Sequence, residues 1–129
     1  MTLARSVVPQ TYIVQVEALA KSGGGFDFSC YPERVWVGDG AAVLIYQLVE
    51  PTPADVVFLL PSVPGIDDGQ MSTISISRNG KLMVFSDIDT SYADFKFELN
   101  VADKSGTVYA HDPEVINRPD TLQVQGQSA

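Results

Sequence analysis

The chain is poor in the side chains that most enzymes and metal sites depend on. Its 129 residues include one cysteine, one histidine and one tryptophan. Because a disulfide needs two cysteines, Cys30 cannot form one within the chain, and no oxidising compartment is required. With His111 as the only histidine, the residue count excludes a transition-metal site built from several histidines and cysteines. We therefore expect no metal ion and no other cofactor.

Positive charge and long apolar runs are also scarce. Eight lysines and arginines face sixteen aspartates and glutamates, which gives a net charge of −8. This balance disfavours a sequence-independent nucleic-acid binder and a partner of anionic membranes, because both need many cations. No apolar run approaches the roughly 18 residues of a membrane span. Pro9, Gln10 and Gln15 interrupt the only candidate for the apolar region of a signal peptide, so we expect a cytoplasmic protein.

Alternation of apolar and polar residues is what the chain has in abundance. It predicts strands or hairpins over residues 12–19, 26–30, 34–37, 42–49, 56–60, 72–85, 95–101 and 107–111. The Asn79-Gly80 pair is typical of a tight hairpin turn. The most hydrophobic segment, 42–49, is expected to be a central strand, and 56–60 to be buried on both faces.

These segments predict an all-β protein. About seven to nine short strands at this spacing favour an immunoglobulin-like antiparallel β-sandwich. Trp36 is the candidate for the core tryptophan of such a fold. Residues 1–119 are expected to form a single domain, and the glutamine-rich residues 120–129 a flexible tail.

Several features resemble a known family. They are a Gly-x-x-x-aliphatic motif at Gly40 to Leu44, the strand that contains Phe58, an aromatic-rich penultimate strand, and the run Asp112-Pro113-Glu114-Val115-Ile116-Asn117. Over residues 32–119 the chain resembles the DP-EP family of small bacterial proteins and, more distantly, bacterial inclusion-body proteins of the same size. The resemblance implies an immunoglobulin-like sandwich and a bacterial source, and it implies no catalytic residues.

The Asp112-Pro113-Glu114 run has a structural and a functional interpretation. The residue before a proline favours an extended conformation, so Pro113 suits the start of an edge strand. Asp112 could accept a hydrogen bond from the backbone amide two residues on. The alternative is that Asp112 and Glu114 take part in binding.

An acidic segment offers the best candidate for a metal or ligand site. Asp87, Asp89 and Ser91 supply oxygen atoms at alternate positions, as in a calcium-binding loop. Tyr92 stands where such a loop needs glycine, which favours a plain acidic hairpin loop. The alternative function is therefore a small-ligand or carbohydrate-binding domain, with calcium assistance from Asp87, Asp89, Ser91 and Asp94.

Catalysis has the least support. His111 beside Asp112 and Glu114 could act as a base, but an exposed histidine at the end of a strand is the simpler interpretation. Cys30 could act as a nucleophile only if His111 lay beside it, and a buried small side chain is the interpretation we prefer.

We therefore expect a non-enzymatic protein-interaction module. Its partner would be another protein or a second copy of the chain, with a homodimer as the default form. Five aromatic residues are candidates for an exposed surface: Tyr31, Trp36, Tyr46, Tyr92 and Tyr109. We expect the interaction surface to include Tyr109 and His111, which share one side of their strand, together with Asp112 and Glu114.

Overall fold

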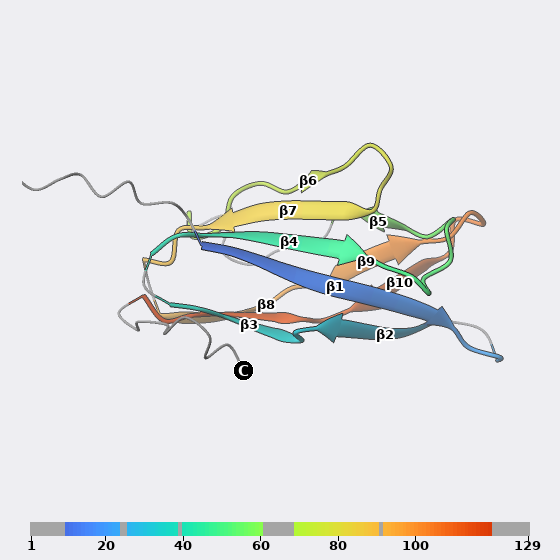
Figure 1. Ribbon diagram of the computed structural model, residues 1–129, viewed down its shortest axis with the longest axis horizontal. Helices are drawn as coiled ribbons and strands as arrows, with labels where there is room; N and C mark the ends of the chain where they lie inside the picture. Colours follow the sequence, from blue (N-terminus) through green and yellow to red (C-terminus); the bar gives the residue numbers. More distant parts are fainter. Residues whose placement is uncertain (1–9, 24–25, 39, 61–68, 91, 120–129) are drawn as a thin grey trace, which may run out of the picture.

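The strands of this protein form three sheets (Figure 1). A computed structural model describes residues 10–23, 26–38, 40–60, 69–90 and 92–119. Within these ranges it contains eleven strands and no helix, so the all-β prediction is confirmed. None of the described residues belongs to a helix long and apolar enough to cross a membrane. The predicted tail, 120–129, lies outside the described residues.

Each predicted segment overlaps at least one strand. The strands are β1 Gln10–Ala20, β2 Phe26–Tyr31, β3 Arg34–Val37, β4 Ala42–Leu48, β5 Val57–Leu59, β6 Ser75–Ile76, β7 Leu82–Asp87, β8 Ala93–Lys96, β9 Leu99–Ala102, β10 Val108–His111 and β11 Glu114–Asn117. The hairpin predicted at Asn79-Gly80 joins β6 to β7. Figure 1 shows β4 and β7 on one side of the molecule and β3 and β8 on the other.

The largest sheet has five strands in the order β2-β1-β4-β7-β6. Strand β4 is at its centre, as its hydrophobicity predicted. Strands β1 and β4 run parallel, with Val14 opposite Tyr46 and Val16 opposite Leu48. The expectation of a purely antiparallel protein is therefore wrong, because the segment that joins β1 to β4 carries two further strands.

The predicted strand over 95–101 is divided between the two smaller sheets. One has the order β10-β9-β5, and the other has the order β3-β11-β8. Lys96 pairs with Glu114 and Leu99 with His111, so the register is continuous across the gap. In the gap, the Phe97 amide donates to the Pro113 carbonyl at 3.3 Å. Pro113 has no N–H to donate in return, so the ladder is interrupted there. This interruption contributes to the excess of strands over the predicted seven to nine.

The expected edge position of the strand after Pro113 is wrong. Strand β11 lies between β3, which runs parallel to it, and β8. The Glu114 backbone amide, which Asp112 was expected to bind, donates instead to the Glu33 carbonyl at 3.2 Å. Pro113 therefore begins an interior strand whose first amide bonds to the neighbouring chain segment.

Three aromatic rings form the centre of the core. The ring centroids of Tyr46, Phe85 and Phe97 lie 5.3 to 5.9 Å apart. The alternation over residues 95–101 holds, since all four of its apolar side chains are buried. Trp36, by contrast, is 51% exposed, so its predicted place in the core is wrong. The three rings fill the core instead.

Strand β5 is not buried on both faces as expected. Phe58 is 3% exposed, whereas Val57 and Leu59 are only partly buried. The strand lies at the edge of its three-stranded sheet, where one face packs on the core. A short apolar run is compatible with either arrangement, because its pattern does not distinguish a strand buried on both faces from one buried on a single face.

The turn at Gly80 offers a test of how tightly β5 and the β6–β7 hairpin pack. Gly80 has a φ of +74°, and a Cβ added there would lie 2.6 Å from the Val57 Cβ. Gly106 has a φ of +85° and nothing within 4 Å of its added Cβ. Gly106→Ala should therefore lower the free energy of unfolding by about 1 kcal/mol through backbone strain alone. Gly80→Ala should lower it by about 2–4 kcal/mol, because overpacking adds to the strain. Denaturant unfolding measures both, and equal losses would show that Val57 moves aside freely.

Candidate functional site

The outer face of the β3-β11-β8 sheet carries a cluster of aromatic and charged side chains. The strand register places Trp36, Ile116 and Asp94 in one row across the sheet. Directly paired residues share a face, so Arg34, Glu114 and Lys96 form the adjacent row. With Tyr92 and Arg118 at the ends of the strands, these rows make up what we call the Trp36 face: Arg34, Trp36, Tyr92, Asp94, Lys96, Glu114, Ile116 and Arg118.

Arg118 connects the two exposed rings of the Trp36 face. Its guanidinium carbon lies 5.5 Å from the centroid of the Trp36 ring and 5.6 Å from that of Tyr92. Its Nη1 lies 3.1 Å from an Asp94 carboxylate oxygen. Trp36 and Tyr92 are 51% and 58% exposed. A cation between two rings favours a fixed arrangement of all three side chains.

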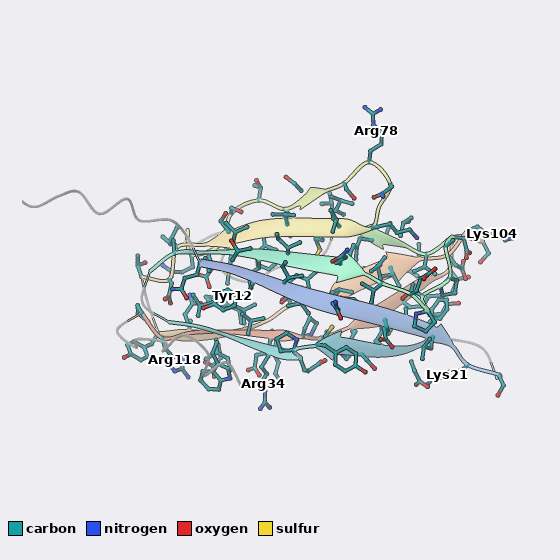
Figure 2. All side chains as sticks on the ribbon, in the orientation of Figure 1. Tyr12, Lys21, Arg34, Arg78, Lys104 and Arg118 are labelled. Atoms are coloured by element: carbon teal, nitrogen blue, oxygen red, sulfur yellow. The ribbon has the colours of Figure 1, made fainter. Side chains whose placement is uncertain are left out.

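A second ion pair lies at the other end of the Trp36 face. The Arg34 Nε donates to the Glu114 Oε1 at 2.9 Å. Figure 2 shows Arg34 and Arg118 on the same, lower side of the molecule. Glu114 is therefore on the Trp36 face, while Asp112 precedes the strand and is exposed to solvent.

The predicted orientation of β10 is wrong. The Tyr109 ring packs against Phe26 with centroids 4.4 Å apart, and its hydroxyl donates to Asp103 at 3.4 Å. Val108, on the other side of the strand, is 54% exposed. The rings of β2 cover the side of β10 that was expected to face solvent, so Tyr109 is no open binding surface.

His111 is close to a glutamate that sequence reasoning did not consider. Its Nε2 lies 2.5 Å from the Glu33 Oε1, and its ring stacks on Phe28 at 5.7 Å. The ligand atoms of Cys30, Glu33 and His111 all lie within 4.8 Å of one another. One feature of the sequence indicated this cluster: catalysis by Cys30 would need a histidine beside it, and His111 is the only histidine. Glu33 was missed because it lies 78 positions from His111 in the chain.

Cys30 is held as a neutral thiol. It is 5% exposed, and burial raises its pKa to about 12, with a further contribution from the charge of Glu33. The expectation of a small buried side chain is confirmed. A thiol with so high a pKa is a poor nucleophile, since the thiolate is the reactive form.

The acidic segment 87–94 is split between the interior and the surface. Asp87 is fully buried, and its Oδ1 accepts hydrogen bonds from the Asn117 side chain and the Asp89 amide, both at 2.9 Å. Asp89 is 3% exposed and has a φ of +55°. Asp94 instead lies on the Trp36 face, and Ser91 is outside the described residues. Calcium binding by this segment stays a prediction.

Burial gives Asp87 unusual electrostatics. Desolvation raises its pKa above the ordinary 3.8, and the hydrogen bonds from Asn117 and Asp89 offset part of this increase. Asp87 Oδ2 and Asn117 Oδ1 have no hydrogen-bond partner within the described part of the chain. Ionisation of Asp87 therefore works against the folded state.

The chain matches the model of a known protein family. A profile of the DP-EP family matches residues 10–119, which is most of the chain. The chain belongs to the DP-EP family. No curated protein matches it. In this DP-EP chain the match covers all eleven strands, and it includes the Trp36 face and the His111–Glu33 pair.

Cys30 should be unreactive in the folded, metal-free protein. At pH 8 we expect a chromogenic disulfide reagent to modify it at least about 100-fold more slowly than in the denatured chain, because burial and a pKa of about 12 both suppress attack by the thiolate. The same reagent in guanidinium chloride provides the reference rate. Similar rates in both states would show that Cys30 is accessible.

Two substitutions separate the charge of Asp87 from its role as a hydrogen-bond acceptor. Asp87→Asn keeps an oxygen for Asn117 and removes the buried charge, so the free energy of unfolding at pH 7 should stay equal or increase. Asp87→Ala should lower it by about 1–3 kcal/mol, because the Asn117 amide loses its acceptor.

The pH dependence of Asp87 has a definite sign. Because its pKa is higher in the folded than in the unfolded chain, the folded state holds the extra proton. Its contribution to the free energy of unfolding therefore falls as pH rises from about 3.8 through the raised pKa, and Asp87→Asn should lack this decrease. Denaturant unfolding at several pH values measures it; an Asn variant as unstable as the Ala variant would contradict the assignment.

Proposed function

We propose that this protein is a non-enzymatic protein-interaction module that binds a second copy of itself through the Trp36 face. The observation that carries the proposal is the exposed pair of rings, Trp36 and Tyr92, on either side of the Arg118 guanidinium. Tryptophan, tyrosine and arginine are the residues that most often dominate the binding energy of protein interfaces.

The internal contacts of the Trp36 face favour binding. Arg118 is held by two rings and by Asp94, and Arg34 is held by Glu114. Side chains that are already ordered lose less conformational entropy when a partner covers them. Ile116, 4% exposed between Trp36 and Asp94 in the register, adds an apolar base beneath the charged groups.

Charge explains why a second copy is the occupant we propose. The Trp36 face carries three cations and two carboxylates, whereas the whole chain has a net charge of −8. Two copies that meet through this face bring together nearly neutral surfaces and keep their acidic surfaces apart. In a two-fold dimer, the same face of each copy meets the other. The ion pairs Arg34–Glu114 and Arg118–Asp94 of one copy therefore present both signs of charge to a surface that also carries both signs.

We further infer that the domain is an immunoglobulin-like sandwich. The continuous register across Pro113 supports treating the two three-stranded sheets as one layer. The contacts of Phe97 with Tyr46 and Phe85, which belong to the five-stranded sheet, support a second layer opposite it.

Light scattering behind size-exclusion chromatography tests the dimer. We expect a species of twice 13.9 kDa, both with calcium and with chelator. Trp36→Ser should weaken dimerisation by about 30-fold or more, because loss of a hot-spot residue weakens binding by at least about 2 kcal/mol. Val108→Ser is the matched control, since Val108 is equally exposed but lies on β10.

Two results would contradict this proposal. A wild-type protein that stays monomeric at high micromolar concentration would rule out self-association and leave the Trp36 face to a different protein. A Trp36→Ser variant that dimerises like the wild type, while Val108→Ser does not, would move the interface to β10.

A further inference from the structure

Three chain segments bring different metal-binding groups together at one place. Cys30 is the penultimate residue of β2, Glu33 is in the connection from β2 to β3, and His111 ends β10. Within the described ranges these residues form the one group of three such side chains whose ligand atoms come within 4.8 Å of one another. We propose that Cys30, Glu33 and His111 form a zinc-binding site.

The donor set selects the kind of metal. A thiolate, an imidazole and a carboxylate together suit zinc, whereas calcium and magnesium prefer oxygen ligands alone. Bound zinc would carry a charge balanced by the Cys30 thiolate and the Glu33 carboxylate, so the loaded site is neutral overall. That balance suits a site whose cysteine is buried within an acidic protein.

The distances need only a small adjustment. Ligand atoms about 2.0–2.3 Å from a tetrahedral zinc lie roughly 3.3–3.7 Å from one another. The His111 Nε2 and the Glu33 Oε1, now 2.5 Å apart, must therefore separate by about 1 Å. The Glu33 side chain is 49% exposed and that of His111 is 27% exposed, so both have room to move and the ion can enter from solvent.

The surrounding structure fixes the backbone at Cys30 and Glu33 and provides a stacking partner for His111, while the Glu33 and His111 side chains keep room to adjust. Phe28 stacks on the imidazole ring of His111, with an interplanar angle of 14°. The carbonyl of Glu33 accepts the amide hydrogen of Glu114, which ties the β2–β3 connection to β11. Cys30 is fixed by its pairing with Val16 in the largest sheet. Ligands supported in this way bind metal more tightly than flexible ones.

A buried hydroxyl without a partner among the described residues lies on the same sheet face as Cys30. The Tyr46 hydroxyl is fully buried and has no hydrogen-bond partner within the described part of the chain. Tyr46 in β4 and Cys30 in β2 lie on the same face of the largest sheet, because their partners in β1, Val14 and Val16, are two residues apart. A buried donor without a partner is uncommon, and a thiolate at Cys30 would give this neighbourhood an acceptor.

Binding changes the protonation of the site in a defined way. The Cys30 thiol gives its proton to solvent as the sulfur–zinc bond forms, and His111 binds as the neutral imidazole. Zinc thereby replaces the hydrogen bond between His111 and Glu33. The three protein ligands leave a fourth position for water on the side of the exposed Glu33.

Cobalt(II) provides a visible probe for the proposed site. Metal-free protein, prepared with a chelator that is then removed, is titrated with cobalt chloride. We expect one equivalent to produce the sulfur-to-cobalt charge-transfer band and the intense visible bands of a tetrahedral ion, and one equivalent of zinc to abolish them. Zinc should also raise the thermal midpoint of the wild-type protein, because it binds only the folded state.

Single substitutions assign the ligands. Cys30→Ala should lose the charge-transfer band, and His111→Gln and Glu33→Gln should each weaken cobalt binding by about 10-fold or more. Asp112→Asn is the matched control, since it removes an exposed carboxylate next to His111 in the chain. If Cys30→Ala does not fold, the two variants of the partly exposed ligands decide the question.

Two results would contradict the zinc site. The proposal is overturned if the wild-type protein shows no charge-transfer band at saturating cobalt, or if His111→Gln and Glu33→Gln bind cobalt as tightly as Asp112→Asn does. The proposed dimer is tested separately, because Trp36→Ser leaves all three ligands intact.

Discussion

The missing N–H of Pro113 is the constraint on which the arrangement of both proposed sites depends. It interrupts the ladder between residues that otherwise keep one register, and so it divides one long hairpin into β8 with β11 and β9 with β10. On one side of the interruption, β10 packs its rings against β2 and brings His111 to Glu33. On the other side, β11 pairs with β3 and presents the Trp36 face. A single residue thus separates the proposed zinc site from the proposed dimer face.

Local patterns in the sequence were sufficient for most of the fold. Alternation predicted which side chains of residues 95–101 are buried, and the Asn79-Gly80 pair predicted the β6–β7 turn. The hydrophobicity of 42–49 predicted a central strand. These features succeed because they depend on neighbours within a few residues, where burial of one face and the backbone freedom of glycine leave little choice.

The candidate sites were harder to predict because they depend on contacts between distant segments. Alternation predicts that Trp36 and Val35 lie on opposite sides of β3, but it does not predict which side packs on the core. The pairing with β11, which in turn pairs with β8, determines that side. For the same reason the exposed side of β10 was assigned wrongly. The nearness of Glu33 to His111 has no local signature, since 78 positions separate them. Asp87 looked like a surface ligand because its burial depends on Asn117 from β11.

The pairing of β3 with β11 also has a consequence for how the chain acquires its structure during synthesis. Arg34 and Glu114, which face each other across this pair, are 80 positions apart in the chain. On a ribosome, β3 must therefore wait until almost all of the described chain has been made before its parallel neighbour exists. Such long-range pairing slows folding, because a large loop must close before its contacts can stabilise it. Until then both edges of β3 are open instead of one, and a chaperone or a nascent sister chain could pair with the edge that β11 later covers.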